Sequence, residues 1–202
     1  PNAAAIVNPN QHGCQFPSKA LAGVGVAFYL MLALRKYCRE QTWFEQQGLQ
    51  EPNIAQLLDL VALGTVADVV PLDANNRILV QQGLNRIKAG QTRPGIQALL
   101  EVAKRNQANI VASDFGFAVG PRINAAGRLD DMSYGIHCLM ESNLAIARDM
   151  AEELDQLNQA RREIEQGIQL EAETIMQKLQ LTQAALPFGI ALFQRDWHQG
   201  VI

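Results

Sequence analysis

The sequence is poor in cysteine and lacks the residue spacings of zinc-binding and disulfide-rich domains. Its three cysteines, Cys14, Cys38 and Cys138, are odd in number and far apart, and no Cys-x-x-Cys or Cys/His ligand spacing occurs. This usage indicates reduced thiols and predicts a cytoplasmic location, because disulfides persist mainly in oxidising compartments.

A strong excess of basic residues is also missing. The formal net charge of −3 argues against a broad basic surface that binds nucleic acid indiscriminately, although a local basic groove stays compatible with it. Aromatic residues make up only 6% of the chain and form no evident platform on which bases could stack. The apolar content of 48% and the charged content of 18% are nevertheless typical of a folded globular protein.

No apolar run is long enough for a comfortable membrane span. The longest stretch free of charged and strongly polar residues, Ala20 to Leu34, is shorter than the ~20 residues that a spanning helix needs, so we expect a buried core helix there. The length of 202 residues suits one domain or parts of two. Because the chain opens at Pro1 without a Met and stops at Ile202 in mid-pattern, we expect an internal piece of a longer protein.

The stretch Leu57–Leu72, LLDLVALGTVADVVPL, is almost continuously apolar but contains Asp68. Pro71 disfavours helix at the preceding residue, so the pattern predicts a buried helix that ends near Asp68 and presents this side chain beyond its end. A carboxylate in such a run must be paired, hydrogen-bonded or bound to a metal. Asp68 therefore caps the next segment, pairs with an arginine, or serves a metal or catalytic site.

The stretch Ser113–Leu129, SDFGFAVGPRINAAGRL, predicts a loop, because its glycines and its proline preclude a long regular helix. Arg122 and Arg128 flank Asn124 in this segment. Two guanidinium groups on a tight loop suit a bidentate hold on phosphate oxygens, to which Asn124 could add a hydrogen bond. The alternative is a structural loop whose arginines pair with the two aspartates that follow it.

Apolar periodicity predicts helices over most of the remaining chain. Ser18 and Asn53 are candidate N-caps of two helices, and further helices are expected over Asn75–Ala89 and Pro94–Arg105. A last helix over Leu144–Leu179 would be ~50 Å long and would join two domains or form a coiled-coil dimer.

Two short apolar runs, Ala3–Val7 and Leu186–Phe193, predict strands. The sequence RDWHQGVI follows the second run. Its His198 is either a contact to phosphate or a packing residue beside Trp197.

GTVADVVPL, GPRINAAGRL and RDWHQGVI together resemble motifs of the RecJ-like single-strand exonucleases of the DHH phosphoesterase superfamily. The resemblance covers nearly the whole chain. It implies that Asp68 is a catalytic ligand of a Mn²⁺ or Mg²⁺ site whose other ligands, in the Asp-His-His signature, lie upstream of Pro1. It also implies that Arg122, Asn124, Arg128 and His198 contact DNA phosphate.

The resemblance further implies an α/β fold that is mostly helical in this piece. Residues 1–142 would form the C-terminal part of a DHH domain, residues 143–181 a long connecting helix, and residues 182–202 the start of a DHHA1 domain.

The implied function is 5′-to-3′ exonuclease activity on single-stranded DNA in repair and recombination, by two-metal phosphodiester hydrolysis, with this piece inactive by itself. The implied partners are single-stranded DNA and single-strand binding protein, without a membrane, and the protein would be a monomer in the cytoplasm. Two alternatives stay open: a phosphoesterase of short oligonucleotides or cyclic dinucleotides, and a catalytically inactive scaffold in a replication complex.

Overall fold

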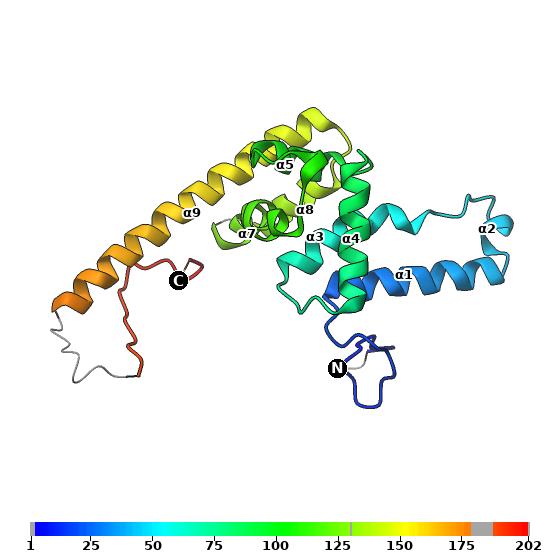
Figure 1. The fold of residues 1–202 in the computed structure, drawn as a ribbon, viewed down its shortest axis with the longest axis horizontal. Helices are drawn as coiled ribbons and strands as arrows, with labels where there is room; N and C mark the ends of the chain where they lie inside the picture. The colour runs from blue at the N-terminus through cyan, green and yellow to red at the C-terminus, as the bar shows by residue number, and fades with distance from the viewer. Residues whose placement is uncertain (1–2, 130, 179–187, 202) are drawn as a thin grey trace.

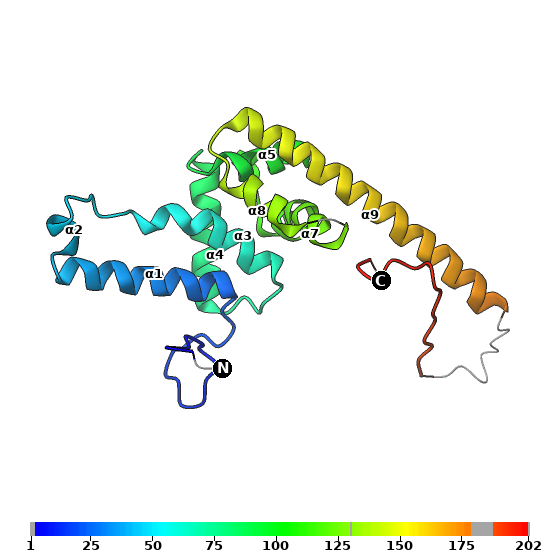
Figure 2. The same ribbon diagram turned by 180° about the vertical axis from the view of Figure 1, so that it is seen from behind.

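A computed structural model describes residues 3–129, 131–178 and 188–201 of the chain (Figure 1). The regular structure within these ranges is helical, which confirms the mostly helical prediction. A bundle of helices forms the body of the molecule, and the last helix, α9, extends from it as an arm (Figures 1 and 2). Among the described residues, no helix combines the length and apolar character that crossing a membrane requires.

Both predicted strands are wrong as far as the structure describes them. Ala3–Val7 and residues 188–193 are irregular, whereas Leu186 and Pro187 lie outside the described residues. A strand needs a second strand to pair its backbone groups, and the described residues contain none. The apolar content of the two runs alone therefore does not create strands here.

The first half of the chain packs α3 between α1 and α4. Its elements are α1 (Gly23–Glu40), α2 (Trp43–Gln46), the 3₁₀ turn η1 (Ile54–Leu57), α3 (Leu58–Ala67) and α4 (Ala74–Lys88). Helix α4 approaches α3 so closely that a Cβ at Gly83 would lie 2.2 Å from the Leu58 carbonyl oxygen. Only glycine fits at this crossing, so the sequence itself fixes how tightly the two helices pack.

Of the two predicted N-cap residues, Asn53 and Ser18, one begins a helical segment in the structure and the other does not. Asn53 caps η1 by accepting a hydrogen bond from the Ala55 backbone N–H, as predicted. The prediction for Ser18 is wrong, because α1 begins only at Gly23. The buried Ser18 hydroxyl instead donates to Asp73 Oδ2 at 2.6 Å, and Asp73 caps α4. Ser18 therefore ties the segment before α1 to the start of α4.

The second half of the chain completes the core. Its elements are α5 (Pro94–Val102), η2 (Gln107–Asn109), α6 (Ala112–Asp114), the π-helical turn η3 (Phe115–Val119), α7 (Gly120–Leu129), α8 (Met132–Met140) and α9 (Leu144–Lys178). The main apolar cluster draws on α3, α4, α5, α7 and the first half of α9. The helices predicted over Asn75–Ala89 and Pro94–Arg105 are thus confirmed, within a few residues at their ends.

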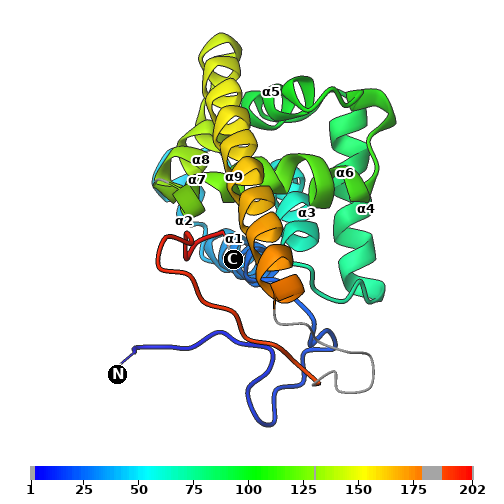
Figure 3. The ribbon, with the colours of Figure 1, turned by 90° about the vertical axis from the view of Figure 1, so that its left-hand side faces the viewer.

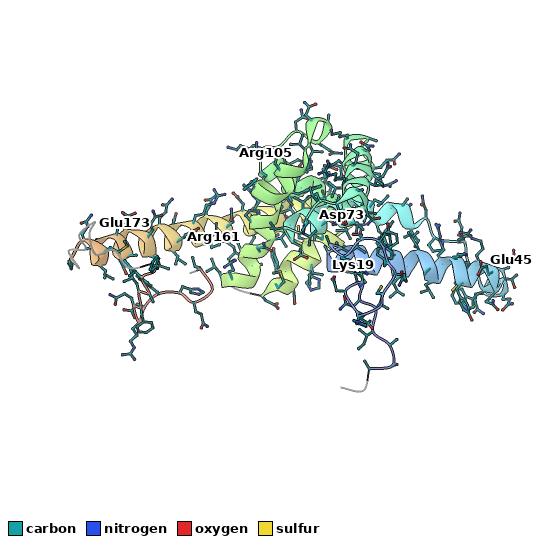
Figure 4. All side chains as sticks on the ribbon, turned by 60° about the horizontal axis from the view of Figure 1, so that its bottom comes forward. Lys19, Glu45, Asp73, Arg105, Arg161 and Glu173 are labelled. Carbon is teal, nitrogen blue, oxygen red and sulfur yellow. The ribbon has the colours of Figure 1, made fainter. Side chains whose placement is uncertain are left out.

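Helix α9 is one continuous helix of 35 residues, as predicted, and Leu179 lies outside the described residues. Its first half crosses α5 and α7 (Figure 3) and buries Ala147, Ala151 and Leu154 in the core. Its second half, where Arg161 and Glu173 are labelled in Figure 4, lies beyond the core. The helix therefore has a packed half and an exposed half.

Candidate functional site

Asp68 lies at the C-terminal end of α3, where the backbone leaves the helix. The prediction that this carboxylate projects beyond the end of an apolar helix is confirmed, whereas the assumption that it is buried is wrong, because Asp68 is exposed. The next residue, Val69, has a φ of 56° and is 86% exposed. A β-branched residue with positive φ is a strained conformation, so the chain directly after Asp68 is held in an unfavourable geometry.

The buried carboxylate of this apolar run is Asp59, which the sequence pattern did not single out. Asp59 is 1% exposed and forms an ion pair with Arg93, whose Nε lies 3.2 Å from Oδ2. The Thr92 hydroxyl and the Arg93 backbone N–H also donate to this carboxylate, each at 3.1 Å. The sequence signal that could have indicated these partners is the position of Thr92 and Arg93 directly before Pro94, where a helix start is predicted. Asp59 joins α3 to the start of α5 and is a structural residue.

The predicted loop over GPRINAAGRL is wrong, because Gly120–Leu129 forms helix α7. Helix α7 continues directly from the π-helical turn Phe115–Val119, and Pro121, which has no N–H to donate, follows this irregular turn. A Cβ at Gly120 would lie 2.9 Å from the Phe115 carbonyl oxygen and 3.4 Å from Ala67 Cβ. The glycine therefore accommodates the Phe115 carbonyl oxygen of the π-helical turn, and the start of α7 lies against Ala67 at the end of α3, next to Asp68.

Arg122 is held by one contact to α9 and one contact to the preceding turn η3. Its Nη2 lies 2.8 Å from Asp155 Oδ1, and its Nη1 donates to the Ala118 carbonyl oxygen at 2.6 Å. The two side chains of the ion pair are only 13% and 19% exposed. Of the two predicted acidic partners, Asp131 caps α8 instead, and Asp130 lies outside the described residues.

Arg128 and His198 are brought together by the fold, although they are far apart in sequence. Arg128 Nη1 donates to the Gly200 carbonyl oxygen at 2.7 Å, and the Gly200 N–H donates to His198 Nδ1 at 3.2 Å. The Trp197 indole N–H donates to Glu171 of α9 at 2.8 Å and holds the same segment. The C-terminal segment therefore returns to the exposed end of α7.

The five predicted site residues do not form one cluster. Asn124 is exposed on α7, and Arg122 faces α9, whereas Arg128 and His198 share a contact to Gly200. Asp68 is linked to them through the packing of Gly120 on Ala67. The predicted site residues therefore lie at two neighbouring positions, the junction between α3 and α7 and the C-terminal end of α7.

A divalent metal ion needs more ligands than this part of the chain provides. Among the described residues, no group of three or more His, Cys, Asp or Glu side chains could hold a metal. Mn²⁺ and Mg²⁺ prefer oxygen ligands and take about six of them. The exposed carboxylate of Asp68 suits such an ion as one ligand, and the other ligands would come from outside the described residues.

Comparison with known proteins gives the relatives of the chain. No protein-family model matches it. The single-stranded-DNA-specific exonuclease RecJ of Escherichia coli is 62% identical over all 202 residues, which span 35% of that relative. Crystal structures of Thermus thermophilus RecJ in complex with Mn²⁺ and with Mg²⁺ each cover 93% of the chain with a TM-score of 0.68, at 34% and 33% identity.

The aligned parts make up 25% and 27% of those two crystallised chains. The chain therefore spans about a third of the length of its curated relative and a smaller share of the crystallised ones. The resemblance predicted from the three motifs is confirmed, and the chain is similar along its whole length to a segment of the single-stranded-DNA-specific exonuclease RecJ.

Proposed function

We propose that the chain is part of a metal-dependent exonuclease that degrades single-stranded DNA from its 5′ end in repair and recombination. The observation that carries the proposal is the similarity to RecJ over every residue of the chain. RecJ is named a single-stranded-DNA-specific exonuclease, and its crystal structures hold Mn²⁺ or Mg²⁺. The longer protein that contains this chain would carry out the reaction.

Asp68 is the proposed catalytic metal ligand. Its carboxylate is exposed at the end of a rigid apolar helix and lies at a strained turn, which is a position suited to holding a ligand in fixed geometry. A divalent metal pair bound there would activate water and stabilise the leaving oxygen of the phosphodiester. The role of this chain is to fix one carboxylate against the start of α7.

Arg122, Asn124, Arg128 and His198 are the proposed contacts to the DNA phosphates. All but His198 lie on α7, whose first turn packs beside Asp68. Arg128 and Asn124 are exposed. Arg128 and His198 are both hydrogen-bonded to the Gly200 backbone. Guanidinium and amide donors bind phosphate oxygens without reading base identity, as sequence-independent degradation requires.

The proposed organisation follows from the position of α9. Residues 1–142 would belong to a DHH domain, residues 143–181 to a connecting helix, and residues 182–202 to the start of a DHHA1 domain. The exposed second half of α9 supports a connecting role, and Arg161 in its apolar seam argues for a monomer over a coiled coil. Single-strand binding protein as a partner and a cytoplasmic location are part of the proposal.

The test uses the full-length protein and single-stranded oligonucleotides labelled at either end. We expect Mn²⁺- or Mg²⁺-dependent release of nucleotides from the 5′ end, and loss of at least ~10³-fold in turnover for Asp68→Ala. The control is Asp149→Ala, which removes an exposed carboxylate from α9 and should leave turnover unchanged.

Three results would contradict the proposal. Near-normal turnover of Asp68→Ala at limiting Mn²⁺ would remove Asp68 from the metal site. A strong preference for dinucleotides or cyclic dinucleotides would indicate the phosphoesterase alternative. Complete absence of hydrolysis in the wild type, with a folded protein, would indicate the scaffold alternative.

A further inference from the structure

The guanidinium of Arg122 is held by two contacts and keeps further N–H donors that these contacts do not use. An arginine carries five N–H groups, and Arg122 uses one on Nη1 for the Ala118 carbonyl oxygen and one on Nη2 for Asp155. Each terminal nitrogen therefore keeps one further N–H. A planar guanidinium that keeps a free N–H on each terminal nitrogen can still donate to phosphate oxygens.

Asp155 is itself held in place by the helix that carries it. Its Oδ1 lies 2.8 Å from Arg122 Nη2, while its Oδ2 accepts a hydrogen bond of 2.7 Å from Gln159 Nε2, one turn further along α9. Both carboxylate oxygens are thus engaged. The orientation of the Arg122 fork is therefore set by Asp155 on α9 together with the Ala118 carbonyl oxygen in η3.

Stability alone does not explain this polar contact. Arg122 Nε and both amide atoms of Asn158 are buried without a hydrogen-bond partner among the described residues. Asn158 is 1% exposed and lies one turn from Asp155 on α9. Buried polar atoms without partners and buried ion pairs destabilise a helix interface relative to well-packed apolar side chains.

A second ion pair between α9 and the body differs in these respects. Arg148 of α9 and Glu101 of α5 lie 2.6 Å apart, and their side chains are 48% and 39% exposed. Neither residue is a proposed DNA contact. This pair ties α9 to the body at the surface, and it provides a matched control for the Arg122–Asp155 pair.

We propose that Asp155 is a positioning residue, which fixes the Arg122 fork so that its free N–H groups meet a DNA phosphate. The inference rests on the proposed role of Arg122 and assigns a task to α9 beyond joining two domains. Asp155 does not contact the DNA. It limits the freedom of Arg122, so that the arginine loses little conformational entropy when phosphate binds.

The first test compares single and double variants of the full-length protein on single-stranded DNA. Asp155→Asn keeps the size of the side chain and removes its charge, and we expect kcat/KM to fall about tenfold to hundredfold. In an Arg122→Ala background the same change should have no further effect, because there is no fork left to orient. Glu101→Gln should leave kcat/KM unchanged.

The second test separates positioning from simple attachment of α9. The swapped variant Arg122→Asp with Asp155→Arg restores an ion pair between α7 and α9 but moves the guanidinium to the other helix. We expect the melting temperature to recover relative to Arg122→Asp alone, while kcat/KM stays low. Recovery of both quantities would show that the pair only attaches α9 and would overturn the inference.

The outcomes also distinguish this inference from the proposed function. Normal kcat/KM in Asp155→Asn, with a strong loss in Arg122→Ala, would overturn the positioning role and leave Arg122 as a phosphate contact. Normal kcat/KM in Arg122→Ala would overturn the role of Arg122 itself. A rise in kcat/KM for Asp155→Asn would show that Asp155 competes with phosphate, which also contradicts positioning.

Discussion

The two ends of helix α3 carry carboxylates that the fold treats in opposite ways. Asp59, in the first turn, is 1% exposed and accepts hydrogen bonds from Thr92 and Arg93. Asp68, at the last turn, is exposed beside the strained residue Val69. The apolar residues between them place one carboxylate in the core and the other at the surface.

The position of each carboxylate relative to the helix dipole deepens the contrast. Asp59 lies at the positive end of α3, where a negative charge is favourable, whereas Asp68 lies at the negative end, where it is unfavourable. A cation bound to Asp68 would offset that unfavourable position. The comparison teaches that burial in an apolar run marks the structural carboxylate, and that exposure at a rigid, strained helix end marks the candidate ligand.

The largest expected effect is the complete inactivity of residues 1–202 by themselves. One exposed carboxylate cannot hold two divalent ions about 3.5–4 Å apart, and neither end of α3 supplies a second ligand. The measurement is release of nucleotides from single-stranded DNA by the purified chain with Mn²⁺. Reproducible cleavage that chelator abolishes would show that the metal site lies within this chain.

Asp59→Ala should cause the largest loss of stability among the carboxylate variants. It leaves the Arg93 guanidinium without its buried partner, so we expect the free energy of unfolding to fall by about 3–5 kcal/mol. Thermal unfolding of the full-length protein checks this, with Asp68→Ala as the control that changes stability by less than about 0.5 kcal/mol. Equal losses in the two variants would remove the contrast between the ends of α3.

Arg122 and Arg128 extend the comparison to the two ends of α7. Each Arg→Ala variant should make the plot of log affinity for single-stranded DNA against log salt shallower by roughly 0.7. Only Arg122→Ala should also destabilise the protein, by about 2 kcal/mol, because it deprives the mostly buried Asp155 of its partner. An unchanged salt slope in both variants would make them structural residues.

Asp73, which caps α4 just after the Asp68 turn, should give the smallest effect. The Asn76 backbone N–H, and next the Ser18 hydroxyl, lower the pKa of this carboxyl below its usual 3.8. Folding therefore favours the ionised form, and this stabilisation is present above pH 3.8 and is lost as the pH falls through the lowered pKa. Asp73→Asn should flatten the acid side of the stability–pH curve. An identical acid slope in variant and wild type would contradict this assignment.

Local patterns were sufficient for the elements whose signals lie within a few residues. The apolar periodicity of α9 and the Pro94 start of α5 predicted both helices. The loop prediction over α7 failed because its glycines and proline were interpreted as helix breakers. The helical run instead contains a π-helical turn directly before Pro121, and a Cβ at Gly120 would lie 2.9 Å from the Phe115 carbonyl oxygen of that turn.

The roles of charged residues depended on contacts between distant segments. Asp68 was identified from its motif, but the burial attributed to it belongs to Asp59, whose partners lie more than 30 positions away in sequence. The partner of Arg122 likewise comes from α9 and not from the adjacent acids. Sequence patterns thus identified residue types suited to the chemistry, while their partners followed only from the packing.

Binding of Mn²⁺ to the full-length protein tests the central claim most directly, namely that Asp68 serves the metal and Asp59 the fold. Calorimetric titration of Asp68→Ala should show at least a tenfold weaker affinity or the loss of one bound ion, with an unchanged melting temperature. Asp59→Asn should bind Mn²⁺ as the wild type does at a temperature where it remains folded. Wild-type affinity and stoichiometry in Asp68→Ala would contradict the account.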